Sequence, residues 1–247
     1  MKITIIGSGG TTLTKSKACP SILIDEDILI DCGPGSLKNM VEIDTDLTKI
    51  KKIMITHYHA DHVGDLIPLL WAIQLAESKE SLEIIGYRKI EKFTISLLKI
   101  MHTPKEFTIF NVRFRSLIGG EEFDEVKTFK AKHRPTDIAY RVERNGKSVC
   151  YTGDTRFYRP LANFASKCDI LIHDATFLDE QKKIASLTNH STASQAGKIA
   201  KMADVKTLIL THILPHNTQY EEKYIKQASK EFDGEIIVAR DLQTIKI

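Results

Sequence analysis

Four side chains able to bind metal ions crowd into one short segment of the chain. Residues 56–65 read THYHADHVGD and contain His57, His59, Asp61 and His62. Neutral imidazoles and carboxylates are the ligands that zinc and similar divalent ions take. A single histidine at such a position is usually a core or surface residue, but four polar groups this close together need a common partner. The spacing therefore predicts a metal site.

Three more residues of the same kinds follow later segments that have the pattern of buried strands. His133 comes after VKTFKAK, Asp154 after KSVCYTG, and His212 after VKTLILT. Strand ends along one edge of a sheet can meet at a single cleft, and polar loop residues on a rigid scaffold are the usual way to build a site. We therefore expect these three side chains to complete the same metal centre.

The order H-x-H-x-D-H suits two ions better than one. His57 and His59 alternate along an extended backbone, so they share a face and can bind one ion. Asp61 and His62 come after the chain turns and can bind a second ion, while the two oxygens of Asp154 can bridge the pair. In such sites the ions lie about 3.5–4 Å apart, and a water between them loses a proton and becomes the nucleophile.

The elements that must position these residues are short apolar strands alternating with segments of helical periodicity. Both halves of the chain carry both kinds, which predicts an α/β protein with two sheets packed face to face and helices outside. No linker or low-complexity stretch interrupts the pattern, so we expect residues 1–247 to form a single domain. Strands are expected in KITIIG, SILIDEDILIDCG, KKIMIT, NVRFRSLI, VKTFKAKH, IAYRVERNGKSVCYTGD, DILIHDATF, VKTLILTH and EIIVARD.

Capping and turn residues mark where several of these elements begin. Thr192 and Gln195 form a capping box for the helix that follows them. Asn145-Gly146 suits a type I′ turn between two strands. Asp65 is expected to cap a further helix. The helical faces themselves are formed by Leu66, Leu69, Leu70 and Ile73, and by Ile90, Phe93, Leu97 and Met101.

Composition and charge exclude several classes of protein. The net charge is only +3 and no basic run of five or more residues occurs, so there is no electrostatic tail for nucleic acid. No stretch of eighteen apolar residues occurs, which argues against a membrane span. The N-terminus lacks an apolar leader, so we expect a reduced, cytoplasmic protein. The protein has four cysteines, namely Cys19, Cys32, Cys150 and Cys168. None of them form a C-x-x-C pair, which excludes zinc-ribbon and thioredoxin-type proteins.

The segment THYHADHVGD, together with the later metal-binding positions, resembles the signature of the metallo-β-lactamase superfamily. The resemblance spans the chain from IDCGPG to THILPH and implies a four-layer αββα sandwich. It also implies two divalent metal ions, with zinc favoured and manganese or iron as alternatives. Members with a redox iron pair carry Glu where His59 stands here, which points to hydrolysis. The implied ligands are His57, His59 and His133 for one ion, Asp61, His62 and His212 for the other, and Asp154 as the bridge.

Three further segments are similar to ribonuclease Z and its phosphodiesterase relatives: DCGPG, HDATF and HSTASQAGKIAKMADVKTLILTH. The resemblance implies that His190 helps to protonate the departing oxygen and that Asp61 serves in catalysis as well as in metal binding. Asp31 and Asp174 are expected to orient ligands from outside the coordination sphere. His173 is a further candidate for such an orienting role. The alternatives are that Asp31 is only a turn residue and that His173 is a hydrogen-bonded core residue.

The substrate follows less directly from the sequence. Ribonuclease Z enzymes carry a Gly/Pro-rich arm that binds tRNA, in many members between the positions that correspond to His133 and Asp154. Only twenty residues separate these two residues here, which is too few for an arm. The segment 77–132 is long enough to contain an unusual one. We therefore expect a phosphodiesterase acting on small, cyclic or RNA phosphodiesters. The alternatives are hydrolysis of an aryl sulfate, lactone or thioester, tRNA 3′ processing, and a non-catalytic binding module. The ribonuclease Z resemblance also implies a homodimer.

Overall fold

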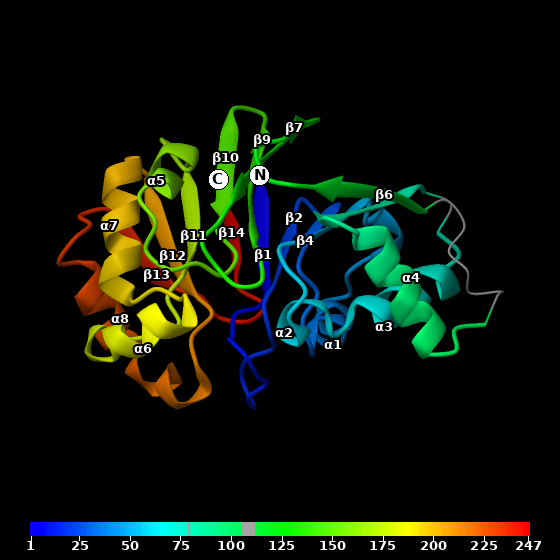
Figure 1. Ribbon diagram of the computed structural model, residues 1–247, viewed down its shortest axis with the longest axis horizontal. Helices are drawn as coiled ribbons and strands as arrows, with labels where there is room; N and C mark the ends of the chain where they lie inside the picture. The colour runs from blue at the N-terminus through cyan, green and yellow to red at the C-terminus, as the bar shows by residue number, and fades with distance from the viewer. Residues whose placement is uncertain (79, 105–111) are drawn as a thin grey trace.

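Two β-sheets with helices on their outer faces make up the protein, as Figure 1 shows. The computed structural model describes residues 1–78, 80–104 and 112–247. Within that part of the chain each sheet has seven strands. The four-layer αββα arrangement expected from the sequence is therefore confirmed.

The first sheet has the strand order β14-β1-β2-β3-β4-β5-β6. Its strands β3 to β6 run parallel, whereas β14, β1, β2 and β3 pair antiparallel. The bounds are β1 Lys2–Gly7, β2 Ser21–Ile24, β3 Ile28–Ile30, β4 Lys52–Ile55, β5 Leu82–Tyr87, β6 Val112–Leu117 and β14 Thr244–Lys246.

The second sheet has the order β13-β12-β11-β10-β9-β8-β7. Strands β10 to β13 are parallel and β7 to β10 antiparallel, so β10 joins the two patterns. The bounds are β7 Glu122–Phe123, β8 Val126–Lys130, β9 Ile138–Arg144, β10 Lys147–Tyr151, β11 Ile170–Asp174, β12 Thr207–Thr211 and β13 Glu235–Val238.

Helices cover the two outer faces, and apolar side chains fill the three spaces between the layers. Ile5, Ile30, Tyr140 and Ile172 are among the residues buried between the sheets. The first sheet is covered by α1 Ser36–Glu42, α2 Ala60–Val63, α3 Leu66–Leu75 and α4 Ile90–Ile100; the second side carries α5 Pro160–Phe164, α6 Lys182–Thr188, α7 Ala193–Ala203 and α8 Glu221–Ala228.

Local signals in the sequence explain several boundaries. Asn145 and Gly146 both have positive φ, 53° and 71°, as the type I′ turn of the β9–β10 hairpin requires. The side chain of Gln195 accepts a hydrogen bond from Thr192 N–H at the start of α7. The structure therefore confirms the turn at Asn145-Gly146 and the capping hydrogen bond of Gln195.

The prediction that Asp65 caps the helix following it, α3, is wrong, because Asp65 caps α1 instead. Asp65 does precede α3, but its side chain makes no capping hydrogen bond there. Its Oδ2 accepts instead from Gly35 N at 2.9 Å and Leu37 N at 3.0 Å, at the start of α1. The carboxylate thus satisfies the free N–H groups of a different helix, because the chain brings α1 alongside the metal-binding segment.

Most of the described residues between 77 and 132 belong to α4 and to the strands β5, β6, β7 and β8. Lys79 and the segment 105–111, which includes the first residue of the expected strand NVRFRSLI, lie outside the described residues. All four cysteines are free and buried. No helix in the described ranges is both long and apolar enough to span a membrane.

Candidate metal centre

The seven predicted metal-binding residues lie where strands of the two sheets end. The carboxyl end of β4 leads into the loop and short helix that carry His57, His59, Asp61 and His62. In the second sheet, three other strands lead into the remaining residues: β8 into His133, β10 into Asp154 and β12 into His212. Both sheets therefore contribute side chains to one edge of the sandwich.

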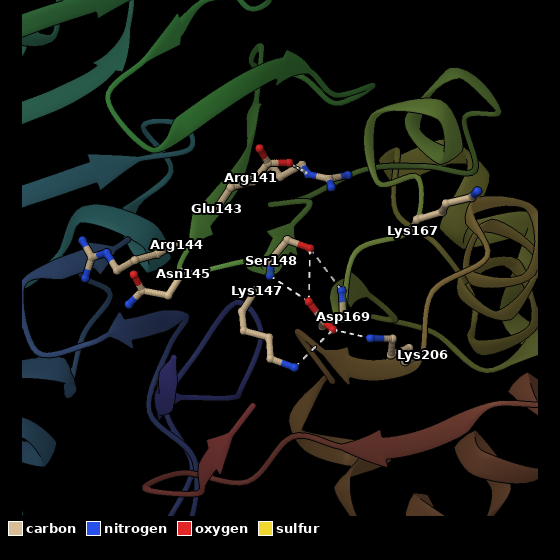
Figure 2. A pocket seen from close by; sticks show the side chains of 10 residues that line it. Arg141, Glu143, Arg144, Asn145, Lys147, Ser148, Lys167, Asp169 and Lys206 are labelled. Carbon is tan, nitrogen blue, oxygen red and sulfur yellow. Dashed lines mark hydrogen bonds and ion pairs between the residues drawn. The ribbon is translucent and has the colours of Figure 1, made fainter.

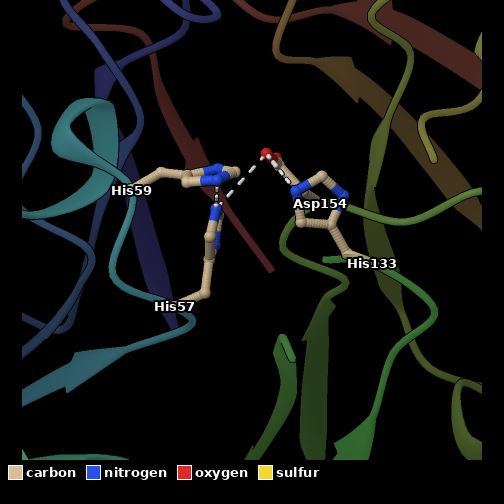
Figure 3. Close-up of side chains that lie close together, drawn as sticks. All are labelled: His57, His59, His133 and Asp154. Atoms are coloured by element: carbon tan, nitrogen blue, oxygen red, sulfur yellow. Dashed lines mark hydrogen bonds and ion pairs between the residues drawn. The ribbon is translucent and has the colours of Figure 1, made fainter. Parts of the chain in front are cut away.

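The first group consists of His57, His59, His133 and Asp154, whose ligand atoms all lie within 4.8 Å of one another. Figure 3 shows these side chains pointing toward one another from different segments of the chain. Asp154 Oδ2 lies 3.7 Å from His57 Nε2 and 3.9 Å from His133 Nε2, while His59 Nδ1 is 2.9 Å from His57 Nε2. His59 is exposed, so this group is open to solvent on one side.

The second group consists of Asp61, His62, His212 and the same Asp154, again within 4.8 Å of one another. His212 Nε2 lies 3.3 Å from both Asp61 Oδ2 and Asp154 Oδ1. His62 Nε2 is 3.4 Å from Asp154 Oδ2. All four residues are buried. Asp154 therefore stands between two groups of metal-binding atoms and belongs to both.

The outer nitrogens of the buried histidines are held by fixed partners. Each Nδ1 has a partner within 3.1 Å, and the partner differs from one histidine to the next. The pairs are His57 with Asp137 Oδ2 at 2.9 Å, His62 with Asp31 Oδ2 at 2.8 Å, His133 with Asn189 O at 3.1 Å, and His212 with Thr176 Oγ1 at 2.9 Å. Metal-binding histidines are commonly oriented in this way, with one nitrogen tied to the protein and the other free.

Several inner atoms lack the partners that buried polar atoms normally have. His62 Nε2, His133 Nε2 and Asp154 Oδ1 are buried and make no hydrogen bond within the described part of the chain. Leaving such atoms without a partner costs about 1–3 kcal/mol each, so a native protein rarely does so without a reason. Imidazole nitrogens and carboxylate oxygens converging in this way fit a pair of divalent ions.

Electrostatics favours the metal-binding protonation states of His57 and Asp154, whereas burial of His62 is outweighed by the carboxylates of Asp154 and Asp31, which raise the pKa of His62 well above its usual value. Burial lowers the pKa of His57 well below its usual value, and repulsion from His62 and His133 adds to the effect. Burial alone would raise the pKa of Asp154, but the charges of His212 and His62 outweigh it and hold that pKa well below its usual range. A neutral imidazole and an ionised carboxylate are the forms that bind metal ions.

The backbone around the centre is held in unusual conformations. His212 and Asp31 adopt positive φ values of 63° and 59°, a region that non-glycine residues seldom occupy. Gly153, with φ 58°, allows the carboxylate of Asp137 to approach, because a Cβ there would lie 2.3 Å from Asp137 Oδ1. Such local strain is typical of functional sites in which the surrounding fold determines the geometry.

His190 lies beside both groups, and its partner is Asp174. Its Nδ1 is 2.8 Å from Asp174 Oδ2, and its ring centroid is 4.9 Å from that of His133 and 5.1 Å from that of His212. Burial lowers the pKa of His190, but the charges of Asp174 and Asp154 outweigh it and raise the pKa to about 9. The carboxylate of Asp174 therefore favours the protonated form of this imidazole, which lies at the rim of the site.

Asp137 was not identified from the sequence, although it contacts two of the predicted residues. It is fully buried, pairs with His57 Nδ1 and accepts a hydrogen bond from Asp154 N at 2.9 Å. Its position four residues after His133 was the available signal, but an Asp before a strand is usually a turn residue. His173, by contrast, is fully buried and belongs to none of the metal-competent groups found among the described residues.

Two facing sheets with outer helices, and histidine groups that share a carboxylate at the strand ends, define a metal-dependent hydrolase of the metallo-β-lactamase fold. The chain belongs to the beta-lactamase superfamily, whose domain matches residues 26–213.

Curated relatives over the whole chain are named ribonuclease Z. The protein of Saccharolobus solfataricus is 29% identical, with 96% of each chain covered, and that of Haloferax volcanii is 26% identical, with 100% of this chain and 95% of the relative covered. The latter alignment spans 302 positions against the 247 residues here, so at least 55 of its positions have no residue in this chain.

Solved structures agree on the fold. The metallo-β-lactamase fold protein YhfI of Bacillus subtilis has a TM-score of 0.85 and 25% identity, covering 99% of this chain and 98% of its own. The short form of human tRNase Z has a TM-score of 0.83 and 24% identity, covering 100% and 99%. The yeast protein PDE1 has a TM-score of 0.68 and 14% identity, covering 100% and 99%.

Proposed function

We propose that this protein is a binuclear phosphodiesterase. One ion would be held by His57, His59 and His133, the other by Asp61, His62 and His212, and Asp154 would bridge them. We further propose that the native ions are zinc, since the groups combine imidazole and carboxylate ligands. We also propose that residues 1–247 form one catalytic domain.

One observation carries this proposal: Asp154 belongs to both groups of metal-binding atoms. When bound, two divalent ions would supply positive charge for the phosphate oxygens and lower the pKa of a water molecule. The protein's own contribution is to fix the ligand rings through their Nδ1 partners and to keep one side open at His59.

His190 supplies the second part of the proposed chemistry. Asp174 occupies its Nδ1, which leaves Nε2 to hold a proton near the departing oxygen of the substrate. The raised pKa of His190, about 9, keeps that proton in place at neutral pH. A positioned acid of this kind contributes about 10²–10⁴-fold to a rate.

The test compares ester classes on protein reconstituted with zinc. Hydrolysis of bis(p-nitrophenyl) phosphate is measured beside that of an aryl sulfate, a lactone and a thioester. We expect turnover of the phosphodiester to be the fastest. Hydrolysis of only the other esters would overturn the proposal.

Two variants separate metal binding from proton transfer. Asp154→Ala is expected to lose both bound metal and activity, whereas His190→Ala should keep its metal and lose about 10²-fold or more in turnover. Metal content is measured by elemental analysis. Full turnover in His190→Ala would remove that residue from the mechanism, and fewer than one ion per wild-type chain would favour a non-catalytic binding module.

A second candidate function, tRNA 3′ processing, is favoured by the name ribonuclease Z that the curated relatives share. The hairpin β9–β10 fills the twenty residues between His133 and Asp154, where many ribonuclease Z enzymes insert their arm. Cleavage of pre-tRNA by the zinc-loaded protein, compared with that of cyclic nucleotides and dinucleotides, separates the two. The ribonuclease Z resemblance also predicts a homodimer, which light scattering would test.

A further inference from the structure

An open groove of about 860 Å³ lies beside the metal centre, with His133 in its wall. Its volume is within the range of small-ligand sites, about 300–1,000 Å³. His133 also belongs to the first metal-binding group, so a molecule bound there can extend directly into the groove. We call this the basic groove; it is lined by residues 130–136, Arg156 and Asn189.

Backbone hydrogen bonds fix the walls of the basic groove. Lys132 N donates to Thr155 Oγ1 at 3.1 Å, and Arg156 N donates to Lys132 O at 3.2 Å. On the other side, His133 Nδ1 contacts Asn189 O at 3.1 Å, one residue before His190. Three segments that are distant in the sequence are therefore joined around the groove and connect it to both parts of the proposed active site.

Among the residues that the structure describes, four cationic side chains and no carboxylate line the basic groove. Lys130, Lys132, Arg134 and Arg156 are all exposed. Within the described part of the chain, none of the four forms an ion pair with Asp or Glu. Since the whole protein carries a net charge of only +3, this is a local concentration of unpaired positive charge.

A second cation-lined pocket, shown in Figure 2, provides the contrast. It lies around the β9–β10 turn, at the opposite end of that hairpin from Asp154. There Lys206 pairs with Asp169 at 2.6 Å and Arg141 with Glu143 at 2.7 Å, as the dashed lines in the figure mark. Lys206 and Arg141 therefore have carboxylate partners, whereas the four cations of the basic groove have none among the described residues.

We propose that the basic groove binds a second phosphate of the substrate, next to the phosphodiester held at the metal centre. This inference rests on the proposed phosphodiesterase function and narrows its substrate class. A cyclic or single diester has no second phosphate to place there, so the enzyme prefers short oligonucleotides. The guanidinium groups of Arg134 and Arg156 suit phosphate because they can donate two parallel hydrogen bonds to it.

The test uses the zinc-loaded protein and the double variant Arg134→Ala/Arg156→Ala. The control is Lys167→Ala/Lys230→Ala, which removes the same charge from two lysines that lie outside the groove and form no ion pair with any residue in the described ranges. The measured quantity is the substrate preference. It is defined as the kcat/KM for a uridine dinucleotide carrying a terminal phosphate, divided by the kcat/KM for bis(p-nitrophenyl) phosphate. We expect it to fall about tenfold or more in the groove variant and to stay at the wild-type value in the control.

Binding provides a readout that does not depend on turnover. Affinity for a hydrolysis-resistant phosphorothioate oligouridylate is measured by fluorescence anisotropy over a range of salt concentrations. The groove variant should bind more weakly, and its salt slope should be shallower by about 0.7 for each phosphate that the variant no longer neutralises.

Unchanged preference and unchanged oligonucleotide affinity in the groove variant would overturn the inference, as would an equal loss in the control. Metal content and circular dichroism of each variant show whether a loss reflects misfolding. If the wild-type protein hydrolyses no phosphodiester but its oligonucleotide affinity still depends on Arg134 and Arg156, the proposed function fails and the phosphate site stands.

Discussion

Asp137 connects the two halves of the candidate centre through one buried carboxylate. Its Oδ2 lies 2.9 Å from His57 Nδ1 and accepts a hydrogen bond from the backbone of Asp154. Burial and repulsion from Asp154 and Asp31 raise its pKa well above the usual range. A group held at this electrostatic cost in contact with a proposed ligand is expected to orient that ligand.

We therefore predict that Asp137→Ala lowers metal affinity about 10–100-fold, the usual effect of losing a partner that orients a ligand. Competition with a chromophoric zinc chelator measures it. Asp169→Asn is the control, because Asp169 is also buried but pairs with Lys206 near the opposite end of the second sheet. Wild-type affinity in Asp137→Ala would show that His57 needs no such support.

Asp174 sets the protonation of His190, and this predicts a change in pH dependence. The protonated imidazole is the proposed acid, so activity falls as pH rises through its pKa. Asp174→Asn removes the charge that raises the pKa of His190. It keeps one of the two side-chain oxygens, which accept from Thr155 N and Thr176 N respectively. We expect the alkaline limb of the kcat/KM profile to move to lower pH by about one to two units.

A purely structural role for Asp174 would lower activity at every pH without moving that limb. His190→Gln provides the second comparison, because it should remove the limb altogether. An unshifted profile in Asp174→Asn would separate this carboxylate from the proton transfer.

Helix α1 depends on a side chain from outside its own sequence. Asp65 Oδ2 accepts from Gly35 N and Leu37 N, two of the N–H groups that a helix start leaves without a partner. Asp65→Ala is expected to lower the free energy of unfolding by about 1 kcal/mol, as measured by urea denaturation.

Asp65→Asn should recover most of this loss, since the amide oxygen can still accept both hydrogen bonds. Asp233→Ala removes an exposed carboxylate whose ion pair with Lys201 is 3.8 Å long, and it should change stability little. Equal stability of Asp65→Ala and wild type would mean that water satisfies α1 equally well.

Strong periodicity and turn chemistry made most elements predictable from the sequence. The β9–β10 hairpin and the start of α7 follow from Asn145-Gly146 and Thr192 with Gln195. Strand β5, Leu82–Tyr87, was missed although it lies inside the first sheet, because six mostly apolar residues fit a strand or a helix equally well. The edge strand β14 is only three residues long and depends on pairing with β1.

The seven proposed metal-binding positions could be selected from the sequence because their residue types and strand-end spacing carry the signal, and the structure brings them together. Asp137 and the true target of Asp65 could not be selected in this way, because both depend on contacts between segments far apart in the sequence. Asp137 reaches the centre only because Gly153 leaves room beside it, and Asp65 caps α1 only because the fold brings the two together.

The candidate centre joins the two sheets at one edge of the sandwich. His57, His59, Asp61 and His62 follow β4 of the first sheet, whereas His133, Asp154 and His212 follow strands of the second sheet. Ions bound between them would connect the two halves where the apolar core ends. A ligand that binds only the folded protein raises its stability in proportion to the logarithm of the ligand concentration.

Metal removal is therefore expected to destabilise the whole molecule. With free zinc at about one hundred times its Kd, the stabilisation is about 2.7 kcal/mol, which for a chain of this size corresponds to a Tm higher by about 5–10 °C. Calorimetry before and after treatment with EDTA measures the difference.

Asp154→Ala should show almost no EDTA effect, because it lacks the carboxylate shared by both groups. His190→Ala should keep the full effect, since His190 lies outside the proposed ligand set. An equal EDTA effect in Asp154→Ala and wild type would mean that the stabilising metal binds elsewhere in the chain.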